Sequence, residues 1–132
     1  MLIKKIKIPS FTDNIGKLSV IEGNSIIPFK IKRVFFVSGG KKNSIRGNHA
    51  HKRCSQFFLC LNKEIEVTFD DGKIKKKFIL KNNQIGILVP PKIWSSQVYT
   101  EKDSLMAVFC NLKYDENEYI RDYQKFLKIV NN

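Results

Sequence analysis

The fold is decided by the stretch Arg46-Gly47-Asn48-His49-Ala50-His51-Lys52-Arg53-Cys54-Ser55-Gln56-Phe57-Phe58, which holds both histidines of the chain. His49 and His51 are two residues apart, so in a strand they project toward the same face. An apolar run, Phe57 to Leu61, follows directly, and we interpret it as the buried continuation of the same strand. Two titratable rings beside basic residues could act on an anionic ligand near neutral pH.

The length and the cysteines point to one small intracellular domain. A chain of 132 residues buries a real core but has no room for a second catalytic domain. No apolar run approaches membrane-spanning length, and residues 1–7 alternate instead of forming an apolar signal core. Cys54, Cys60 and Cys110 are odd in number and have no paired spacing, which predicts neither a disulfide framework nor a zinc site. We therefore expect a cytoplasmic protein with reduced thiols.

The charge is strongly basic but dispersed. The chain has 24 Lys+Arg against 12 Asp+Glu, a formal net charge of +12 that attracts anions. Because the basic residues are spread along the chain, a solvated lysine-rich surface explains most of them. Nucleic-acid binding favours aromatic residues interleaved with basic ones on one exposed face, whereas the aromatic residues here lie mainly in apolar runs. We expect neither nucleic acid nor a membrane as a partner.

Period-two alternation and turn residues predict a chain made mostly of strands. Asp70-Asp71-Gly72-Lys73 lies between two such segments, and Asp-Gly favours a hairpin because it accepts positive φ angles. The glycine- and lysine-rich segment 38–44 reads as a plain loop that leads into the histidine strand. About nine or ten strands at this spacing are typical of a sandwich or barrel. Further strands are expected over residues 2–8, 17–22, 31–37, 86–89, 94–99 and 105–110.

Only the last segment has a helical pattern. Asp115 fits an N-cap with the acidic Glu118 three positions on, and apolar or aromatic residues then repeat at helical spacing. The sequence thus predicts one domain over residues 1–132, with a β-barrel over 1–112 and a helix over 115–130. The aromatic stripe that includes Tyr119 and Tyr123 is expected to pack on the barrel.

A His-x-His pair inside a barrel first suggests a metal. A stable iron or manganese site needs a carboxylate and usually a third histidine. The position five after His51 is Gln56, a poor ligand, the chain has no third histidine, and Ser95 follows Trp94 where another ligand would be expected. The ligand count therefore argues against a metal, and we expect no other cofactor.

Without a metal, the pair is suited to proton transfer. A histidine with a pKa near ~6.5 can take and return a proton around neutrality. Proton transfer between adjacent carbons of a ketone forms an enediolate, whose oxygen needs a positive group beside it. Arg46, three residues before His49, is the candidate for that group. Two neutral histidines hydrogen-bonded in a barrel interior explain the spacing equally well. In a continuous strand Cys54 would face the opposite side of the sheet from both histidines, which argues against a Cys-His nucleophilic pair.

Five segments form a recognisable set that spans nearly the whole chain: residues 27–34, 46–52, 70–72, 90–94 and 114–123. The Arg-Gly-x-His-Ala-His-Lys element combined with the Tyr-Asp-Glu and Tyr-Ile-Arg ending is specific, whereas His-x-His alone is not. Together these segments are similar to the cupin-fold dTDP-sugar 3,4-ketoisomerases, a family that acts on dTDP-4-keto-6-deoxyglucose.

The resemblance implies an all-β cupin domain with a C-terminal helix and a metal-independent isomerase that moves the keto group of a dTDP-linked 4-keto-6-deoxyhexose from C4 to C3. It assigns His49 as the acid and base, His51 as an assisting group and Arg46 to the same pocket. It also implies a homodimer with exchanged N-terminal strands, which would give residues 2–8 a partner. The product normally enters 3-amino-3,6-dideoxyhexose synthesis for surface polysaccharide.

Some positions depart from the family pattern. Ile15 replaces a common arginine, Phe35 and Phe36 replace common tyrosines, and Ser95 replaces a common histidine. These changes leave the proton route and the C4 configuration of the product open. The candidate substrate-binding residues are Lys17, Arg33, Phe36, Lys52, Gln56, Trp94 and Ser96.

Two rival functions stay open at this point. A nucleotide-sugar epimerase on the same fold would invert C3 or C5 and keep the ketone at C4. A non-catalytic basic barrel would only bind a sugar, a nucleotide or an oligonucleotide.

Overall fold

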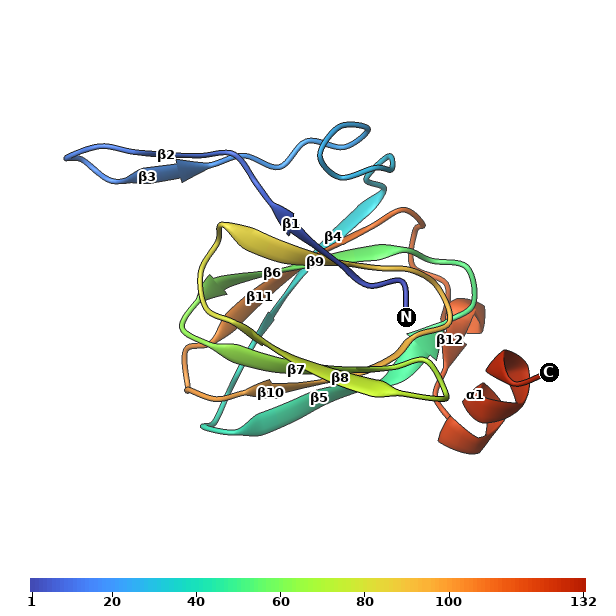
Figure 1. The fold of residues 1–132 in the computed structure, drawn as a ribbon. Coiled ribbons are helices and arrows are strands. Elements are labelled where there is room, and N and C mark those ends of the chain that lie inside the picture. The colour runs from blue at the N-terminus through green and yellow to red at the C-terminus, as the bar shows by residue number, and fades with distance from the viewer.

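Two five-stranded antiparallel sheets face each other in the computed structural model, which describes residues 1–132 (Figure 1). The first sheet has the order β1 (Lys4–Lys7), β9 (Ile85–Val89), β6 (Gln56–Asn62), β11 (Leu105–Cys110) and β4 (Arg33–Ser38). The second has the order β12 (Tyr119–Ile120), β5 (Ser44–His51), β10 (Trp94–Tyr99), β7 (Ile65–Asp70) and β8 (Lys75–Leu80). A separate hairpin consists of β2 (Ser10–Thr12) and β3 (Lys17–Ser19), and the helices are η1 (Glu116–Glu118) and α1 (Tyr123–Val130).

The main core lies between the two sheets. β7 buries Ile65, Val67 and Phe69 at alternate positions, as a strand with one inward face must. The Asp-Gly hairpin predicted between β7 and β8 is confirmed, and Gly72 has a φ of +94° there. The prediction of an all-β cupin fold with a C-terminal helix is confirmed as well.

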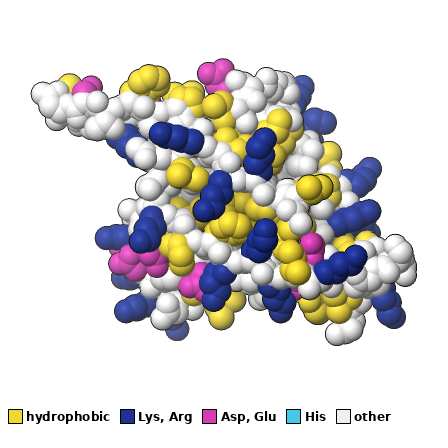
Figure 2. All heavy atoms as spheres, viewed as in Figure 1, with side chains coloured by type: hydrophobic (Ala, Val, Ile, Leu, Met, Phe, Trp, Pro, Cys, Tyr) yellow, Lys and Arg dark blue, Asp and Glu magenta, His cyan; other side chains and the backbone are white.

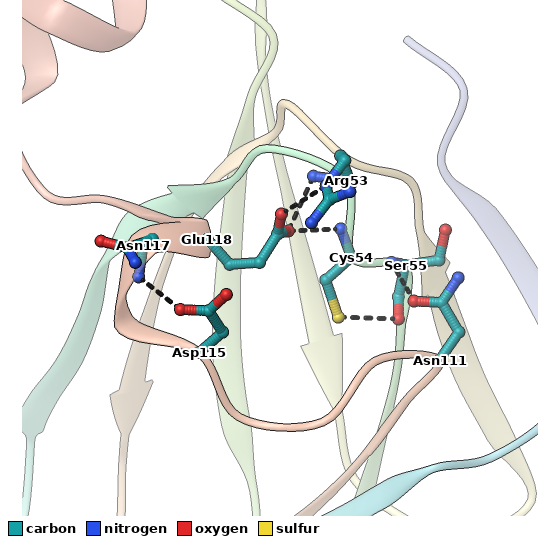
Figure 3. A network of polar contacts seen from close by, with 7 residues as sticks. All are labelled: Arg53, Cys54, Ser55, Asn111, Asp115, Asn117 and Glu118. Carbon is teal, nitrogen blue, oxygen red and sulfur yellow. Dashed lines mark hydrogen bonds and ion pairs between the residues drawn. The ribbon is translucent and has the colours of Figure 1, made fainter.

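The histidine strand does not continue into the apolar run, so that prediction is wrong. β5 ends at His51, β6 begins at Gln56, and the four residues between them carry the chain from one sheet to the other. The buried Glu118 carboxylate holds this loop, because Oε2 accepts hydrogen bonds from the backbone N–H groups of Arg53 and Cys54, both at 2.8 Å (Figure 3). A fixed acceptor for two loop amides makes a sharp crossing stable.

The single helix predicted over residues 115–130 is also wrong in its first half. Asp115 caps only the short 3₁₀ turn η1, and Tyr119 and Ile120 then form β12 beside the end of β5. The helix α1 begins after Asp122, whose side chain accepts a hydrogen bond from the Lys125 N–H at 3.1 Å. A second cap seven residues after the first therefore divides the segment.

The N-terminal strand finds its partner within the chain. β1 pairs with β9 in the register Lys4 to Leu88, so residues 2–8 do not need a second copy for pairing. The hairpin of β2 and β3 instead projects from the body (Figure 1), and it leaves Phe11 and Leu18 exposed. Exposed apolar side chains therefore lie on the hairpin, and also on β4, where Phe36 is 64% exposed.

The basic residues are dispersed over the surface. Figure 2 shows lysine and arginine side chains scattered over the viewed face, with apolar atoms between them and no histidine in sight. This distribution agrees with a solvated basic surface. None of the helices is both long enough and apolar enough to cross a membrane.

Candidate active site

A cavity of about 220 Å³ lies between the two sheets, beside the edge strand β4 and the end of β5. Its floor is apolar, with Phe58, Met106 and Val108 from β6 and β11. Its walls carry charged and titratable groups from the other strands. The complete lining is Arg33, Phe35, Val37, Arg46, Gly47, His49, Gln56, Phe58, Gln97, Met106, Val108, Tyr119 and Arg121.

A β-bulge brings Arg46 and His49 into the same cavity. In a regular strand, two residues three positions apart face opposite sides of the sheet. Here Ser95 pairs with His49 and Ser96 with Gly47, so Asn48 is an extra residue in β5. Gly47 and Asn48 have φ angles of +92° and +60°. The bulge turns Arg46 inward, and the strand parity that a sequence pattern assumes fails at this point.

Three aromatic rings form a cluster at the cavity wall. The His49 ring centroid lies 5.2 Å from that of His51 and 5.0 Å from that of Tyr119. The His51 and Tyr119 centroids are 4.4 Å apart, because the two residues are direct partners in the pairing of β5 and β12. His49 lines the cavity, whereas His51 is buried behind it and is only 6% exposed.

The surroundings of both histidines favour neutral imidazoles. Burial lowers the pKa of His49 below its usual value, and the charge of Arg121 acts in the same direction. Burial and the neighbouring His49 lower the pKa of His51 to about 4. Neither ring nitrogen of His51 has a hydrogen-bond partner in the protein. At neutral pH, His49 is therefore ready to accept a proton.

The cavity is cationic. Arg33, Arg46 and Arg121 line it, and no acidic side chain does. Arg121 is held at the rim by Glu116, which accepts hydrogen bonds from its Nε at 2.7 Å and from its Nη2 at 3.0 Å. These bonds and the Tyr114 hydroxyl lower the pKa of Glu116 to about 2. Such a lining is suited to an anionic ligand.

No group of three or more His, Cys, Asp and Glu side chains converges anywhere in the structure. Gln56 lines the cavity but is hydrogen-bonded through Nε2 to the Cys110 sulfur at 3.5 Å. The donor set around the histidine pair therefore offers two imidazoles and no carboxylate, too few ligands for the site types considered above.

Four of the predicted residues line the cavity together: Arg33, Arg46, His49 and Gln56. His51 supports the wall from behind. Lys52 lies on the neighbouring loop, in a separate surface hollow that shares Tyr119 and Arg121 with the cavity wall.

Phe36, Ser96, Trp94 and Lys17 do not line the cavity. Strand alternation points Phe36 outward, where it is 64% exposed, and turns Phe35 inward instead. The same alternation on β10 turns Gln97, not Ser96, into the cavity.

Trp94 and Lys17 lie in other parts of the fold. Trp94 packs under α1, with ring centroids 5.2 Å from Tyr123 and 5.6 Å from Phe126. Lys17 is on β3 in the projecting hairpin (Figure 1). Trp94 therefore has a core role within this chain, and Lys17 does not reach its own chain's cavity.

Sequence reasoning missed Tyr119, Arg121, Gln97 and Phe35 as lining residues. Tyr119 was grouped with a helical stripe because its spacing to Tyr123 is helical. The signal that was available is the Tyr-Ile-Arg triplet itself, since a β-branched residue between an aromatic and a basic one also fits a short strand.

Comparisons with known proteins give one consistent result. Residues 1–131 match the family model FdtA, described as WxcM-like, C-terminal. Over 127 residues, 96% of this chain and 91% of the relative, the chain is 38% identical to the TDP-4-oxo-6-deoxy-alpha-D-glucose-3,4-oxoisomerase of Aneurinibacillus thermoaerophilus.

Two solved structures are also very similar. A 3,4-ketoisomerase from Helicobacter canadensis has a TM-score of 0.95 and 33% identity, covering 100% of this chain and 99% of that one. QdtA, a sugar 3,4-ketoisomerase from Thermoanaerobacterium thermosaccharolyticum in complex with TDP, has a TM-score of 0.95 and 30% identity, covering 99% and 97%.

Proposed function

The chain belongs to the FdtA family of TDP-sugar 3,4-ketoisomerases, and from that membership we propose how its cavity performs the isomerisation. The enzyme is an isomerase that moves the keto group of a TDP-linked 4-keto-6-deoxyhexose from C4 to C3. The reaction breaks the C3–H bond and makes a C4–H bond, so it needs a base and negative-charge stabilisation beside two adjacent carbons.

His49 is the base in this proposal. It is the one histidine that lines the cavity, and its lowered pKa keeps it neutral at physiological pH. It takes the proton from C3 and returns a proton to C4. His51 is a positioning residue, because its ring packs against His49 from a buried place behind the wall.

Arg46 stabilises the enediolate oxygen in this proposal. The bulge places its guanidinium in the same cavity as His49, and no carboxylate in the lining neutralises it. Arg33 and Arg121 supply positive charge for the diphosphate of the substrate.

The active assembly that we propose is a homodimer. The β2 and β3 hairpin, with Phe11 and Leu18 exposed, would lie against the exposed Val34 and Phe36 on the outer face of β4 in a second copy. β4 is a sheet edge with free backbone groups, which favours pairing with an added strand. We further propose that the reaction needs no metal and takes place in the cytoplasm, where the three free cysteines stay reduced.

The experiment follows the sugar by proton NMR after chelator-treated enzyme is mixed with dTDP-4-keto-6-deoxyglucose in heavy water. The expected product has its ketone at C3 and deuterium at C4, and the coupling to H5 assigns the C4 configuration. Exchange at C3 or C5 with the ketone still at C4 would instead identify an epimerase. Loss of turnover on chelation that added metal restores would overturn metal independence.

His49→Asn is the matched variant for the base. It keeps a polar side chain but removes proton transfer, so we expect turnover to fall by about 100-fold or more while TDP binding is nearly unchanged. TDP affinity is measured by titration calorimetry on the same preparation. Full activity in His49→Asn would remove His49 from the mechanism.

A further inference from the structure

The isomerisation moves two protons, and His49 accounts for only one of them. One proton goes from C3 to C4, and the other goes from the C3 hydroxyl to the C4 oxygen. A single imidazole already engaged with the carbons leaves the oxygen proton without a carrier. Phe35 and Phe36, which lack a hydroxyl, cannot serve.

Tyr119 is the one hydroxyl in the cavity lining. Its oxygen accepts a hydrogen bond from Arg33 Nη1 at 3.1 Å. Arginine has donors only, so the phenolic proton is not used in that bond. No other hydrogen bond within the protein involves this hydroxyl, so its proton is available to a ligand in the cavity.

The two neighbours of Tyr119 favour a role in proton transfer. Arg33 points a charged donor at the phenol oxygen, which stabilises a transient phenolate. The ring lies 5.0 Å from His49, so the phenol and the imidazole border the same space. The guanidinium of Arg33 is itself fixed between the rings of Phe35 and Tyr114, at 4.6 Å and 4.9 Å.

The other lining groups are unsuited to carry this proton. The guanidiniums of Arg33, Arg46 and Arg121 stay protonated, and the amides of Gln56 and Gln97 do not titrate. His51 and the unpartnered hydroxyl of Tyr99 do not line the cavity.

We propose that Tyr119 is a second catalytic residue, which moves the proton between the two sugar oxygens while His49 moves the proton between the two carbons. His49 takes the proton from C3, and the electron pair of that bond forms the C3=C4 double bond. The π pair of the C4 ketone goes to its oxygen, which takes the proton of Tyr119.

The second half of the reaction regenerates both groups. The Tyr119 phenolate takes the proton of the C3 hydroxyl, and the oxygen pair forms the C3 ketone. The C3=C4 pair then takes a proton from the His49 imidazolium at C4, and in heavy water this is a deuteron because the imidazolium N–H exchanges with solvent. No oxidant or reductant is needed, and each group gives up as many protons as it takes.

The inference rests on the proposed function, and Tyr119→Phe separates the two. Without the phenol, His49 still removes the C3 proton, but the enediolate returns to the starting ketone. In heavy water we therefore expect turnover to fall by about 100-fold or more, while deuterium still enters C3 of the starting sugar. A positioning role for Tyr119 would lower exchange and turnover together.

Tyr123→Phe is the matched control. The Tyr123 hydroxyl donates to Asp70 at 2.5 Å, and the ring packs against Trp94 and does not line the cavity. We expect its turnover to be unchanged. Near-normal turnover in Tyr119→Phe, or a parallel loss of exchange and turnover, would overturn the proposal.

A folding defect and a failure of the proposed function are both recognisable. TDP titration and thermal melting show whether Tyr119→Phe is folded, and Arg33→Met provides a second test because it leaves the phenol but removes its donor. We expect Arg33→Met also to raise the ratio of C3 exchange to turnover, and an unchanged ratio would count against the phenolate. If wild-type enzyme forms no 3-keto sugar, the proposed function itself has failed.

Discussion

The imidazole of His51 is buried without a protein hydrogen-bond partner, and this makes the fold sensitive to acid. Its pKa is about 4 in the folded chain and 6.5 in the unfolded one, so below pH 6.5 the unfolded chain binds more protons. The stabilisation is complete above pH 6.5 and is lost as the pH falls toward 4. From the two pKa values we expect a loss of about 2 kcal/mol at pH 5.

The measurement is the free energy of unfolding by urea at pH 7 and pH 5, in the wild type and in His51→Asn. Asparagine does not titrate, so the variant should lose this part of the pH dependence. Carboxylates such as Glu118 titrate in both proteins and cancel in the comparison. An equal change in the free energy of unfolding between pH 7 and pH 5 in the two proteins would contradict a neutral, buried His51.

Residue identity was enough to find part of the site and not the rest. His49 and His51 are recognisable because no other side chain titrates near neutrality without a strong shift. Phe35 and Phe36 are adjacent, and only the register with β11 decides which of them faces inward. Tyr119 was missed because its spacing to Tyr123 fits a helix, whereas pairing with His51 makes it a strand residue.

The bulge in β5 is an element whose geometry depends on one glycine. A Cβ on Gly47 would lie 2.9 Å from both Gln97 Nε2 and the Ser95 carbonyl oxygen. The backbone φ of +92° at Gly47 also disfavours any side chain. Gly47→Ala should destabilise the fold by about 1 to 3 kcal/mol and lower kcat, because Arg46 would no longer share a face with His49. Urea unfolding and steady-state kinetics measure the two effects.

Gly40→Ala is the control for this prediction. A Cβ on Gly40 meets nothing within 4 Å, and its φ is not positive. Its stability and kcat should match those of the wild type. A silent Gly47→Ala would show that the bulge is dispensable.

The loop between β5 and β6 depends on one carboxylate more than on its ion pair. Glu118 accepts two backbone N–H groups in addition to Arg53 Nε, and these amides outweigh the burial that would otherwise raise the pKa of Glu118. Glu118→Ala leaves buried donors without a partner and should cost about 2 to 4 kcal/mol. Arg53→Ala should cost less than about 1 kcal/mol, since that side chain is 77% exposed.

Thermal and urea unfolding of the two variants give the comparison. Similar losses in both would mean that the ion pair, not the amide bonds, holds the loop. Arg53→Ala removes the ion pair but leaves the two amide hydrogen bonds in place. The difference between the two variants therefore measures the contribution of the amide hydrogen bonds.

Among the secondary-structure elements, period-two patterns located most strands within a few residues of their observed bounds. They failed where a side chain far along the chain sets the structure. Nothing in residues 52–55 shows that Glu118 will bind their amides. The sequence pattern therefore predicts one strand where the structure has two, β5 and β6. Residues 115–122 do not continue as a helix because Tyr119 and Ile120 pair with the end of β5.

The molecule as a whole leaves apolar surface on its hairpin and on β4. Phe11 is 63% exposed and Leu18 is 62% exposed, and both belong to the hairpin that projects from the body. We expect the wild type to be a dimer by light scattering, and Phe11→Glu combined with Leu18→Glu to be a monomer, because charges would be buried at the contact.

Ile79→Glu on β8 is the control, since Ile79 is 47% exposed on the opposite edge of the molecule. This variant should remain a dimer. A monomeric wild type, or a dimer that survives the hairpin changes, would rule out exchange through this hairpin.

The Glu118 contact that holds the crossing loop spans 65 positions along the chain. A ribosome adds about 5 to 20 residues per second, so both imidazoles wait about 3 to 14 seconds before Tyr119 and Arg121 are made. Throughout that interval the cavity lacks Tyr119 and Arg121, the part of its wall that lies against the two imidazoles. The site is therefore completed only when the chain has grown by 70 residues beyond His51.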